Sequence, residues 1–414
     1  MSEVAPDEAE LARYQAALLE ALHEAKDPAE VMRALQARDD LRGEQSAIAS
    51  FEPRAVEVGM TLVKLWGERL TTRPVGQMRA LRFEAPHAPL VHRLLPMPIP
   101  GPGEVRIRVR ASGVCGTDVH MHDGSFPVPM PIIPGHEPVG EVDALGEGVT
   151  TLALGERVGV TWVQAGCGAC LGCRESSPHR CARPRTWLSS GGGHSEWMIA
   201  DARGCVRLPS GLAYEEAAPL FCAGYTVMSG FRRAHAAPHE RVAVLGLGGL
   251  GHLAVQIARA HGHAVIAVTR SEAKREEALA LGASDVLVVK KHAGHELMAM
   301  GGAHVLLATS NDLAETRDAL LGLLPEGRLV MMGLASHAPR ELMLDPMVMM
   351  GRGLTVIGGK QGPREDMEAL LQLAARGEVR AMVEVFPMSM SARAMQRLSE
   401  QRVRYRAVLV HDPS

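Results

Sequence analysis

The chain has 414 residues, too long for one ordinary hydrophobic core, so two or three domains are expected. Apolar residues make up 46% and charged residues 22% of it, as in globular proteins, and a formal net charge of -3 excludes a surface that gathers nucleic acid. Its first ten residues hold four acids and no base, and no run approaches about 18 uninterrupted apolar residues, so we expect a cytoplasmic protein without export signal or membrane helix.

Residues 1–76 show apolar side chains at helical spacing. One set comprises Leu11, Tyr14, Leu18, Leu19 and Leu22, and a second, after Pro53, comprises Val58, Leu62, Leu65 and Trp66. We expect a small helical N-terminal extension that packs on the main body or on another subunit. It contains no motif that carries chemistry.

From Met78 the sequence changes to short β-type runs separated by Gly and Pro, such as 105–112 (VRIRVRAS) and 156–163 (ERVGVTWV). This pattern predicts an irregular, strand-rich domain over 77–220. A helix-like segment at 364–376 and later strands, including RYRAVLV, are expected to return the chain to this domain over 356–414.

The segment 221–355 alternates between strand and helix patterns. A buried strand (VAVLG), a Gly-rich turn, a helical stretch over 252–261 and a second apolar strand (HAVIAVT) form a βαβ unit. Further strands are expected at 305–309 (VLLAT) and 327–333 (GRLVMMG). The sequence thus predicts an α/β fold with a parallel sheet.

A G-x-G-x-x-G motif lies between the first strand and the first helix of this unit. Its glycines are Gly246, Gly248 and Gly251, and Leu247, Gly249 and Leu250 fill the positions between them. In that place backbone N–H groups and the helix N-terminus can face a pyrophosphate. The alternative is an ordinary Gly-rich turn.

The acid that would bind a ribose 2'-hydroxyl about 20 residues further on is missing. The positions hold Thr269, Arg270 and Ser271, with Lys274 one turn beyond. Hydroxyls and an arginine can hold a 2'-phosphate, so we expect NADP(H) to be preferred over NAD(H). Alternatively, the two basic residues form a solvated edge and NAD also works.

Four cysteines form a C-x2-C-x2-C-x7-C pattern in one polar loop: Cys167, Cys170, Cys173 and Cys181. Four thiolates can hold one tetrahedral Zn²⁺ at about 2.3 Å per sulfur, with no position left for substrate. The alternatives are reduced cysteines that lie close by chance and an iron–sulfur cluster. Cys205 is outside this pattern and is expected to be a buried structural thiol.

A second, dispersed set comprises Cys115, His136 and Cys222. Each alone reads as an ordinary core residue. Asp118 and Glu137 lie beside the first two, however, as candidate partners or as an exchangeable ligand. Two cysteines and one histidine leave one zinc position open for water or substrate.

The chain resembles the zinc-containing medium-chain alcohol dehydrogenases in five segments that occur in the same order in that family. They are GVCGTDVH, PGHEPVG, the four-cysteine loop, APLFCAGYT and GLGGLG. The resemblance covers residues 77–414 and is closest in style to bacterial and yeast tetrameric enzymes and to cinnamyl-alcohol-type dehydrogenases. It implies a strand-rich GroES-like catalytic domain, a Rossmann domain and a homo-dimer or homo-tetramer.

The resemblance also implies two zinc ions per chain and a role for individual residues. Cys115, His136 and Cys222 would hold the catalytic zinc, and Glu137 would be a transient ligand. Thr117 would relay the proton from the zinc-bound hydroxyl, His120 would pass it toward solvent, and Asp118 would orient His136. Thr226 would lie beside the nicotinamide, Arg406 on the pyrophosphate, and Trp162, His122 and Phe126 around the substrate.

The expected function is therefore hydride transfer between a small alcohol or aldehyde and a nicotinamide cofactor. Two alternatives stay open: a polyol, sorbitol-like or threonine-type dehydrogenase of the same fold, and a zinc-stabilised scaffold whose helical N-terminus is the active part. Nucleic acid and membrane are not expected partners.

Overall fold

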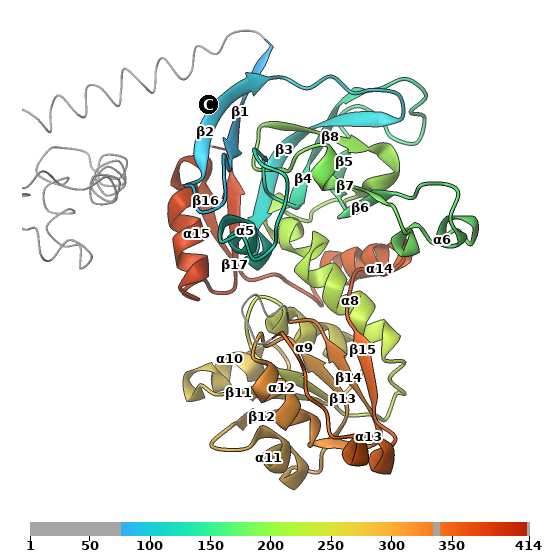
Figure 1. Cartoon of the computed structure of the whole chain (residues 1–414), viewed down its shortest axis with the longest axis vertical. Coiled ribbons are helices and arrows are strands. Elements are labelled where there is room, and N and C mark those ends of the chain that lie inside the picture. The colour runs from blue at the N-terminus through green and yellow to red at the C-terminus, as the bar shows by residue number, and fades with distance from the viewer. Residues whose placement is uncertain (1–75, 334–339, 412–414) are drawn as a thin grey trace, which may run out of the picture. The chain divides into compact units, whose positions relative to one another are not determined.

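The computed structural model describes residues 76–333 and 340–411 (Figure 1). The expected helical extension over 1–76 therefore lies almost entirely outside the described residues. Within them, no helix is both long enough and apolar enough to cross a membrane. The described residues form two large sheets, one mixed and one parallel, and two small two-stranded sheets.

The first sheet has seven strands, of which six follow the order β16-β17-β3-β4-β5-β9 and β8 pairs with β3. Their bounds are β3 Glu104–Val114, β4 Glu137–Leu145, β5 Arg157–Val160, β8 Trp197–Asp201, β9 Cys205–Arg207, β16 Val383–Pro387 and β17 Arg406–Val410. Val105, Ile107 and Val109 alternate along β3 into one buried core. Two small sheets pair β1 (Gln77–Arg82) with β2 (Val91–Pro96) and β6 (Val163–Ala165) with β7 (Arg185–Thr186).

The second sheet is parallel throughout, in the order β12-β11-β10-β13-β14-β15. Its strands are β10 Val242–Leu245, β11 Val265–Thr269, β12 Asp285–Val288, β13 Ala303–Ala308, β14 Leu323–Met331 and β15 Thr355–Gly358. This is the doubly wound order of dinucleotide-binding folds, whose ligand crevice lies at the carboxyl ends of β10 and β13, where the winding reverses. The expected α/β fold class is confirmed.

Helices connect and cover these sheets. The α-helices are α5 Gly116–His122, α6 Leu171–Arg174, α7 Tyr214–Ala217, α8 Ala223–Arg233, α9 Gly251–Ala260, α10 Arg275–Ala280, α11 Ala293–Ala299, α12 Leu313–Leu320, α13 Pro346–Arg352, α14 Arg364–Ala375 and α15 Ser391–Ser399. Short 3-10 turns are η2 Pro178–Arg180, η3 Trp187–Ser189, η4 Ala202–Gly204, η5 Ala218–Phe221, η6 Glu272–Lys274 and η7 Met388–Met390.

The strand β10 shows why the parallel sheet needs helices on both sides. Val242 and Val244 point into the core that contains α8, α9 and α14, whereas Ala243 and Leu245 point into the core that contains α11 and α12. All four side chains are fully buried. A continuous apolar run of this kind is typical of a strand covered on both faces.

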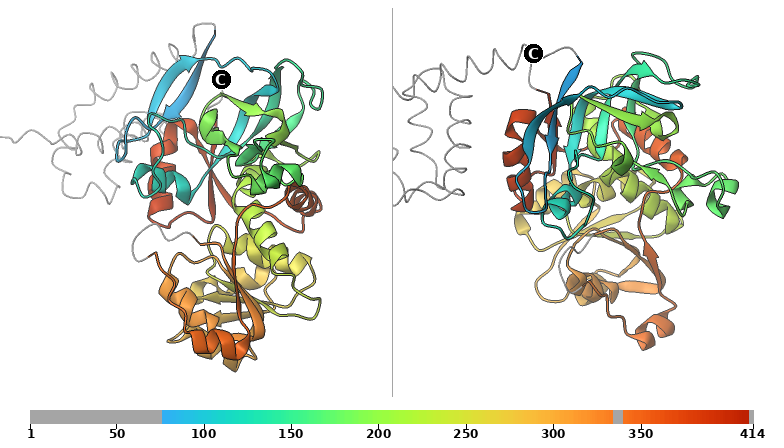
Figure 2. Two further views of the ribbon diagram at one scale, coloured as in Figure 1. Left: turned by 45° about the vertical axis from the view of Figure 1, so that its right-hand side comes forward. Right: turned by 45° about the horizontal axis from the view of Figure 1, so that its top comes forward.

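The end of the parallel sheet differs from the boundary expected at residue 355. β15 (Thr355–Gly358) pairs with β14, so the chain leaves this sheet only after Gly358. It then enters α14, which packs against α8, as the views of Figure 2 show. β15 is an edge strand with mostly exposed side chains, so it lacks the apolar run that marks a buried strand.

Candidate active site

Four side chains from separate parts of the chain converge on one point: Cys115, His136, Glu137 and Cys222. Cys115 lies between β3 and α5, His136 directly precedes β4, which Glu137 begins, and Cys222 lies between η5 and α8. The ligand atoms of all four lie within 4.8 Å of one another. The structure thus brings together the three dispersed residues expected to bind one metal.

The distances within this cluster fit a tetrahedral zinc ion. The two Sγ atoms of Cys115 and Cys222 are 3.9 Å apart, and His136 Nε2 lies 3.3 Å from Cys222 Sγ. Zinc–sulfur bonds of about 2.3 Å at tetrahedral angles place two sulfurs about 3.8 Å apart. A disulfide would need about 2.0 Å, so the spacing suits a shared metal.

Burial affects the protonation of the groups around the cluster. It raises the pKa of Asp118 to about 6 and that of Glu137 to about 7, although Arg406 opposes the latter shift. Burial lowers the pKa of His136, but the neighbouring Cys115 outweighs this and raises it to about 9. A buried carboxyl with a raised pKa takes up a proton unless a cation compensates its charge, so a metal ion at this point would favour the ionised carboxylates and the neutral imidazole.

Asp118 contacts the ligand loops rather than the ligand ring. Its carboxylate accepts from the backbone N–H of Cys115 at 2.8 Å and from that of Gly135 at 3.2 Å. Its Oδ1 lies 4.0 Å from His136 Nδ1, too far for a hydrogen bond. Asp118 therefore fixes the backbone beside two ligands, and it interacts with the imidazole only as an ion pair at this longer distance.

Arg406 lies between the cluster and the glycine loop. Its guanidinium forms a buried ion pair with Glu137 Oε1, while Glu137 Oε2 has no hydrogen-bond partner among the described residues. A Cβ on Gly249 would lie 2.9 Å from Arg406 Nη1, so a side chain there would displace the guanidinium. The resemblance placed Arg406 on the pyrophosphate, and the structure adds its contact with Glu137.

The two expected relay residues lie on α5. Thr117 Oγ1 is 3.9 Å from Cys115 Sγ, which places the hydroxyl at the edge of the cluster. His120 lies one turn further on, with Nδ1 3.7 Å from Asp123 Oδ2. Their order along the helix leads away from the cluster.

Aromatic rings cover one side of His136. The Trp162 ring meets the imidazole edge-on at 5.0 Å, and Phe126 packs against Trp162 at 6.2 Å. Trp187, whose buried ring stacks on His136 at 5.9 Å, belongs to no motif, so the sequence did not predict its place in the site. His122 packs against Phe83 at 5.7 Å, and Phe83 belongs to the same hydrophobic cluster as Trp187 and Trp162.

The glycine loop has the shape that a pyrophosphate needs. A Cβ on Gly251 would lie 1.9 Å from the Gly246 carbonyl oxygen, whereas the space around Gly248 is open to at least 4 Å. The loop leads directly into α9, so N–H groups are available there. Thr226, expected beside the nicotinamide, lies one turn after Cys222, with its N–H 2.9 Å from the Cys222 carbonyl.

The residues at the end of β11 already have protein partners. Arg270 is 69% exposed, and its guanidinium lies 3.5 Å from Glu315 and 3.9 Å from Asp312. Lys274 Nζ donates to the Leu247 carbonyl at 2.8 Å. The two acids lie far along the sequence, beside α12, so the sequence pattern gave no signal of them.

Ser271 and Thr269 form a compact turn at the same strand end. The Ser271 N–H donates to Thr269 Oγ1 at 3.2 Å, and Thr269 itself is buried. This hydrogen bond fixes the direction in which the chain leaves β11.

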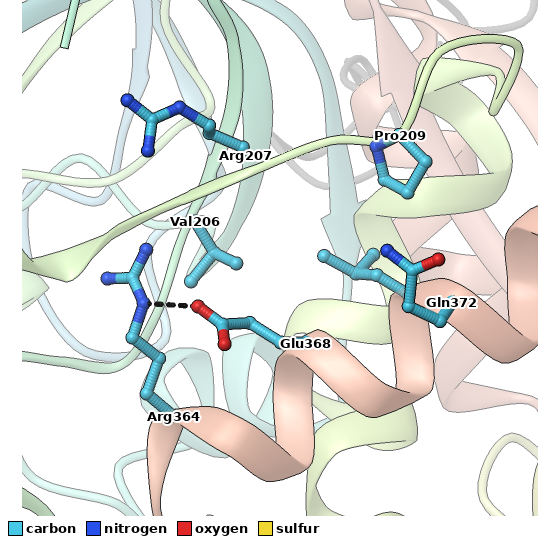
Figure 3. Close-up of a pocket in the computed structure, with 7 residues that line it drawn as sticks. Val206, Arg207, Pro209, Arg364, Glu368 and Gln372 are labelled. Atoms are coloured by element: carbon cyan, nitrogen blue, oxygen red, sulfur yellow. Dashed lines mark hydrogen bonds and ion pairs between the residues drawn. The ribbon is translucent and has the colours of Figure 1, made fainter.

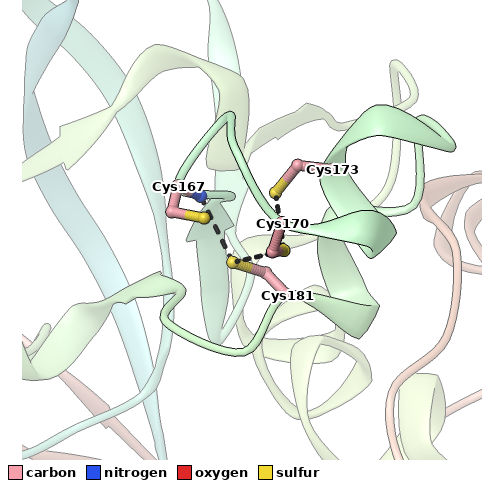
Figure 4. Close-up of side chains that lie close together, drawn as sticks. All are labelled: Cys167, Cys170, Cys173 and Cys181. Carbon is pink, nitrogen blue, oxygen red and sulfur yellow. Dashed lines mark hydrogen bonds between the residues drawn. The ribbon is translucent and has the colours of Figure 1, made fainter.

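The side chains of the four-cysteine loop come together at one point, as their spacing predicts (Figure 4). Cys170 Sγ lies 3.6 Å from Cys173 Sγ and 3.7 Å from Cys181 Sγ, and the Cys167 N–H donates to Cys181 Sγ at 3.2 Å. These sulfur separations again fit one tetrahedral metal and exclude disulfides. Cys205 is buried and belongs to neither cluster, as expected.

A surface hollow of about 250 Å³ lies between β9 and α14 (Figure 3). Its lining consists of Val206, Arg207, Pro209, Arg364, Glu368, Leu371 and Gln372. Its two arginines are already paired, Arg207 with Glu156 and Arg364 with Glu368. None of the expected site residues lines it, so it is separate from the metal cluster.

Comparison with known proteins agrees with this geometry. The alcohol dehydrogenase GroES-like domain matches residues 101–210, and the zinc-binding dehydrogenase family matches residues 249–376. An alcohol dehydrogenase of Geobacillus stearothermophilus is 38% identical over 308 residues, which cover 73% of this chain and 90% of that relative. A mannitol dehydrogenase of Petroselinum crispum is 36% identical over 309 residues, covering 72% and 90%.

Among solved structures, a cinnamyl alcohol dehydrogenase from Sorghum bicolor superposes with a TM-score of 0.73 at 30% sequence identity. The match covers 81% of this chain and 97% of that one. The similarity thus spans both sheets and confirms the resemblance seen in the sequence motifs. The chain therefore belongs to the zinc-containing medium-chain alcohol dehydrogenases and is an alcohol oxidoreductase.

Proposed function

We propose that the protein interconverts a primary or secondary alcohol and its carbonyl compound by hydride transfer, with NADP(H) as the preferred cofactor. The observation that carries this proposal is the convergence of Cys115, His136 and Cys222 next to Arg406, which itself lies under the glycine loop. One metal site and one dinucleotide site are thereby adjacent. The second, four-cysteine cluster would hold a structural zinc.

In this proposal Cys115, His136 and Cys222 would hold a zinc ion, which would supply Lewis-acid activation of the alcohol, and the glycine loop would hold the nicotinamide cofactor, which would supply the hydride acceptor. Thr117 takes up the alcohol proton, and His120 passes it toward solvent. Glu137 stays within reach of the cluster as an exchangeable ligand, because its Oε1, which pairs with Arg406, also lies 4.0 Å from His136 Nε2. Trp162 and Phe126 exclude water from the reacting carbon.

We assign the catalytic domain to residues 77–220 and to the segment after Gly358, and the cofactor domain to the residues between them. The second boundary lies at Gly358 and not at residue 355, because β15 pairs with β14 of the parallel sheet. Substrate would then bind where the two domains approach the zinc cluster.

The cofactor preference rests on Arg270, Ser271 and Lys274 and on the lack of an acid at the end of β11. The acids near Arg270 lower its net attraction for a phosphate, so we expect a preference that falls short of complete exclusion of NAD. Measuring kcat/KM with NADPH and with NADH tests this, and a higher value with NADH would contradict it.

A polyol is the second candidate substrate. The similarity to a plant mannitol dehydrogenase favours it over a threonine-type activity. A panel of aromatic alcohols, short aliphatic alcohols and hexitols with NADP and NAD separates the two readings, because only one class should reach the higher kcat/KM.

The decisive experiment combines turnover with metal analysis. The wild-type chain should bind two zinc ions and turn over at least one alcohol, and Cys115→Ser should retain one zinc and lose turnover at least about a thousandfold, since the metal contributes several kcal/mol. Equal turnover in Cys115→Ser and in the wild type would refute the catalytic site, whereas a lack of turnover by both would leave the scaffold hypothesis.

We also propose that the protein is a homo-oligomer in which β15 pairs with the same strand of a second copy. β15 has β14 as its neighbour on one side only. Met343, Met347 and Met350 beside it are among the most exposed apolar side chains described. An edge strand with an exposed apolar border suits an isologous contact between identical copies.

A further inference from the structure

His252 is a buried histidine that the proposed chemistry does not use. It is the second residue of α9, the helix into which the glycine loop leads, and its side chain is completely buried. A polar ring buried at this position must be hydrogen-bonded, so its partners show what it does.

Both ring nitrogens of His252 have a defined partner. Nδ1 lies 3.0 Å from the Gly248 carbonyl oxygen, and Nε2 lies 3.3 Å from the backbone nitrogen of Met382. A carbonyl only accepts and a backbone N–H only donates, so Nδ1 carries the proton and Nε2 accepts. Burial lowers the pKa of His252 to about 4, which keeps this neutral form at physiological pH.

The ring bond to Gly248 is not needed to form the helix. The backbone N–H of His252 already donates to the same carbonyl at 3.1 Å. The other nitrogen leaves the cofactor-binding helix and reaches the segment before β16, and Tyr405 stacks on the ring at 4.8 Å. The imidazole therefore joins the glycine loop to the part of the chain that carries Arg406.

Gln256, one turn further along α9, strengthens this connection. Its Nε2 donates to the Arg380 carbonyl at 3.0 Å, and its Oε1 accepts from the Arg380 N–H at 2.9 Å. Two successive turns of α9 thus bind the same short segment.

The connection continues to the metal cluster. The Met382 carbonyl accepts from the backbone N–H of Arg406 at 3.1 Å, and the Arg406 guanidinium pairs with Glu137. We propose that His252 is a positioning residue that fixes the glycine loop relative to Arg406 and the cluster, and so sets how the cofactor meets the metal site. This inference rests on the proposed function, because it requires a dinucleotide on the loop.

Two substitutions separate the two ring contacts. In His252→Asn the short amide can still donate to Gly248 but cannot reach Met382, whereas in His252→Gln the longer side chain can accept from Met382. We expect NADPH to bind about tenfold more weakly to His252→Asn, as for one lost hydrogen bond, and His252→Gln to recover most of this affinity.

His261 provides a matched control at the far end of the same helix. Its Nδ1 makes the same type of bond to a carbonyl one turn back, that of Ile257, at 2.8 Å. His261→Asn should leave the Kd of NADPH unchanged. All variants should retain two zinc ions, and Gln256→Ala replaces His252→Asn if the latter does not fold.

The readouts are the Kd of NADPH and NADH from nucleotide fluorescence, the KM and kcat for each, zinc content and melting temperature. A lower melting temperature with unchanged Kd and kcat in His252→Asn would show that the ring only stabilises the fold and would overturn the inference. If the wild-type chain bound neither dinucleotide, the proposed function would fail together with the inference. If the wild type and the variants bound NADPH with the same Kd, the inference on His252 would fail, and the proposed function would remain.

Discussion

In the proposed preference for NADP(H), Arg270 is the residue expected to bind the 2'-phosphate, and it already pairs with acids of its own chain. Glu315 lies 3.5 Å from the guanidinium and is itself fixed by Ser310, whose hydroxyl donates to it at 2.8 Å. Any 2'-phosphate must compete with this carboxylate for the same N–H groups. The acid is therefore expected to reduce selectivity for NADP(H).

Removing that charge gives the first prediction. Glu315→Gln should raise the ratio of kcat/KM for NADPH over NADH by about threefold to tenfold, because about 1 kcal/mol of competing ion pairing near the surface is lost. Asp318→Asn on the same helix, whose carboxylate faces His292 instead, is the control. An unchanged ratio in Glu315→Gln would show that Arg270 does not contact the phosphate.

The buried His252 gives a prediction on pH. Its pKa is lowered to about 4 in the folded chain from about 6.5 when unfolded, so the unfolded state binds more protons between these values. Its contribution to stability is complete above about pH 6.5 and falls by about 1.4 kcal/mol per pH unit below it.

The asparagine of His252→Asn does not titrate, so the variant should lack this contribution of His252 to the pH dependence of stability. Its melting temperature should therefore lie furthest below that of the wild type at pH 7.5 and approach it at pH 5. A difference that stays constant over this range would show that His252 titrates normally in the folded chain.

At the scale of the elements, the four-cysteine loop contains little regular structure. Between Cys167 and Cys181 the only helices are α6 and η2, with four and three residues. The backbone hydrogen bonds within this segment are local, such as that from the Arg174 N–H to the Cys170 carbonyl at 3.0 Å, so we expect a bound metal to contribute much of its order, since the binding energy of the metal becomes folding energy.

Cys170→Ser should therefore reduce zinc from two ions to one and lower the melting temperature by on the order of 10 °C. Turnover at low temperature should persist, since the catalytic ligands lie on other elements. Cys205→Ser, which changes a thiol outside both clusters, should keep two ions. Two zincs in Cys170→Ser would contradict the structural site.

The sequence could predict those elements whose patterns arise from local chemistry. Close cysteine spacing, the glycine motif and the apolar run of β10 each encode their structure within a few residues. Asp312, Glu315 and Trp187 reach their sites from distant segments and belong to no motif, so only the fold reveals them. β15 could not be predicted for another reason. It is an exposed edge strand, and such a strand does not need an apolar sequence pattern.

At the scale of the whole molecule, the exposed edge of β15 predicts self-association. Val356 on this strand is 37% exposed and Met350 on α13 is 80% exposed. Val356→Asp with Met350→Asp should dissociate the oligomer, measured as mass by analytical ultracentrifugation, because a charge buried between copies is costly. Ile99→Asp, at an 85% exposed apolar position elsewhere, should keep the wild-type mass. The wild-type mass in the double variant would place the interface elsewhere.

The ion pair between Glu137 and Arg406 joins residues 269 positions apart, and β17 completes a sheet begun by β3. On a ribosome that adds about 5–20 residues per second, Cys222 emerges on the order of ten seconds or more before Arg406. During that interval the thiols, imidazole and carboxylate exist in the nascent chain without their guanidinium. We expect this early and more anionic intermediate to bind zinc. The order of translation would then place the zinc ion at the cluster before the Arg406 guanidinium arrives.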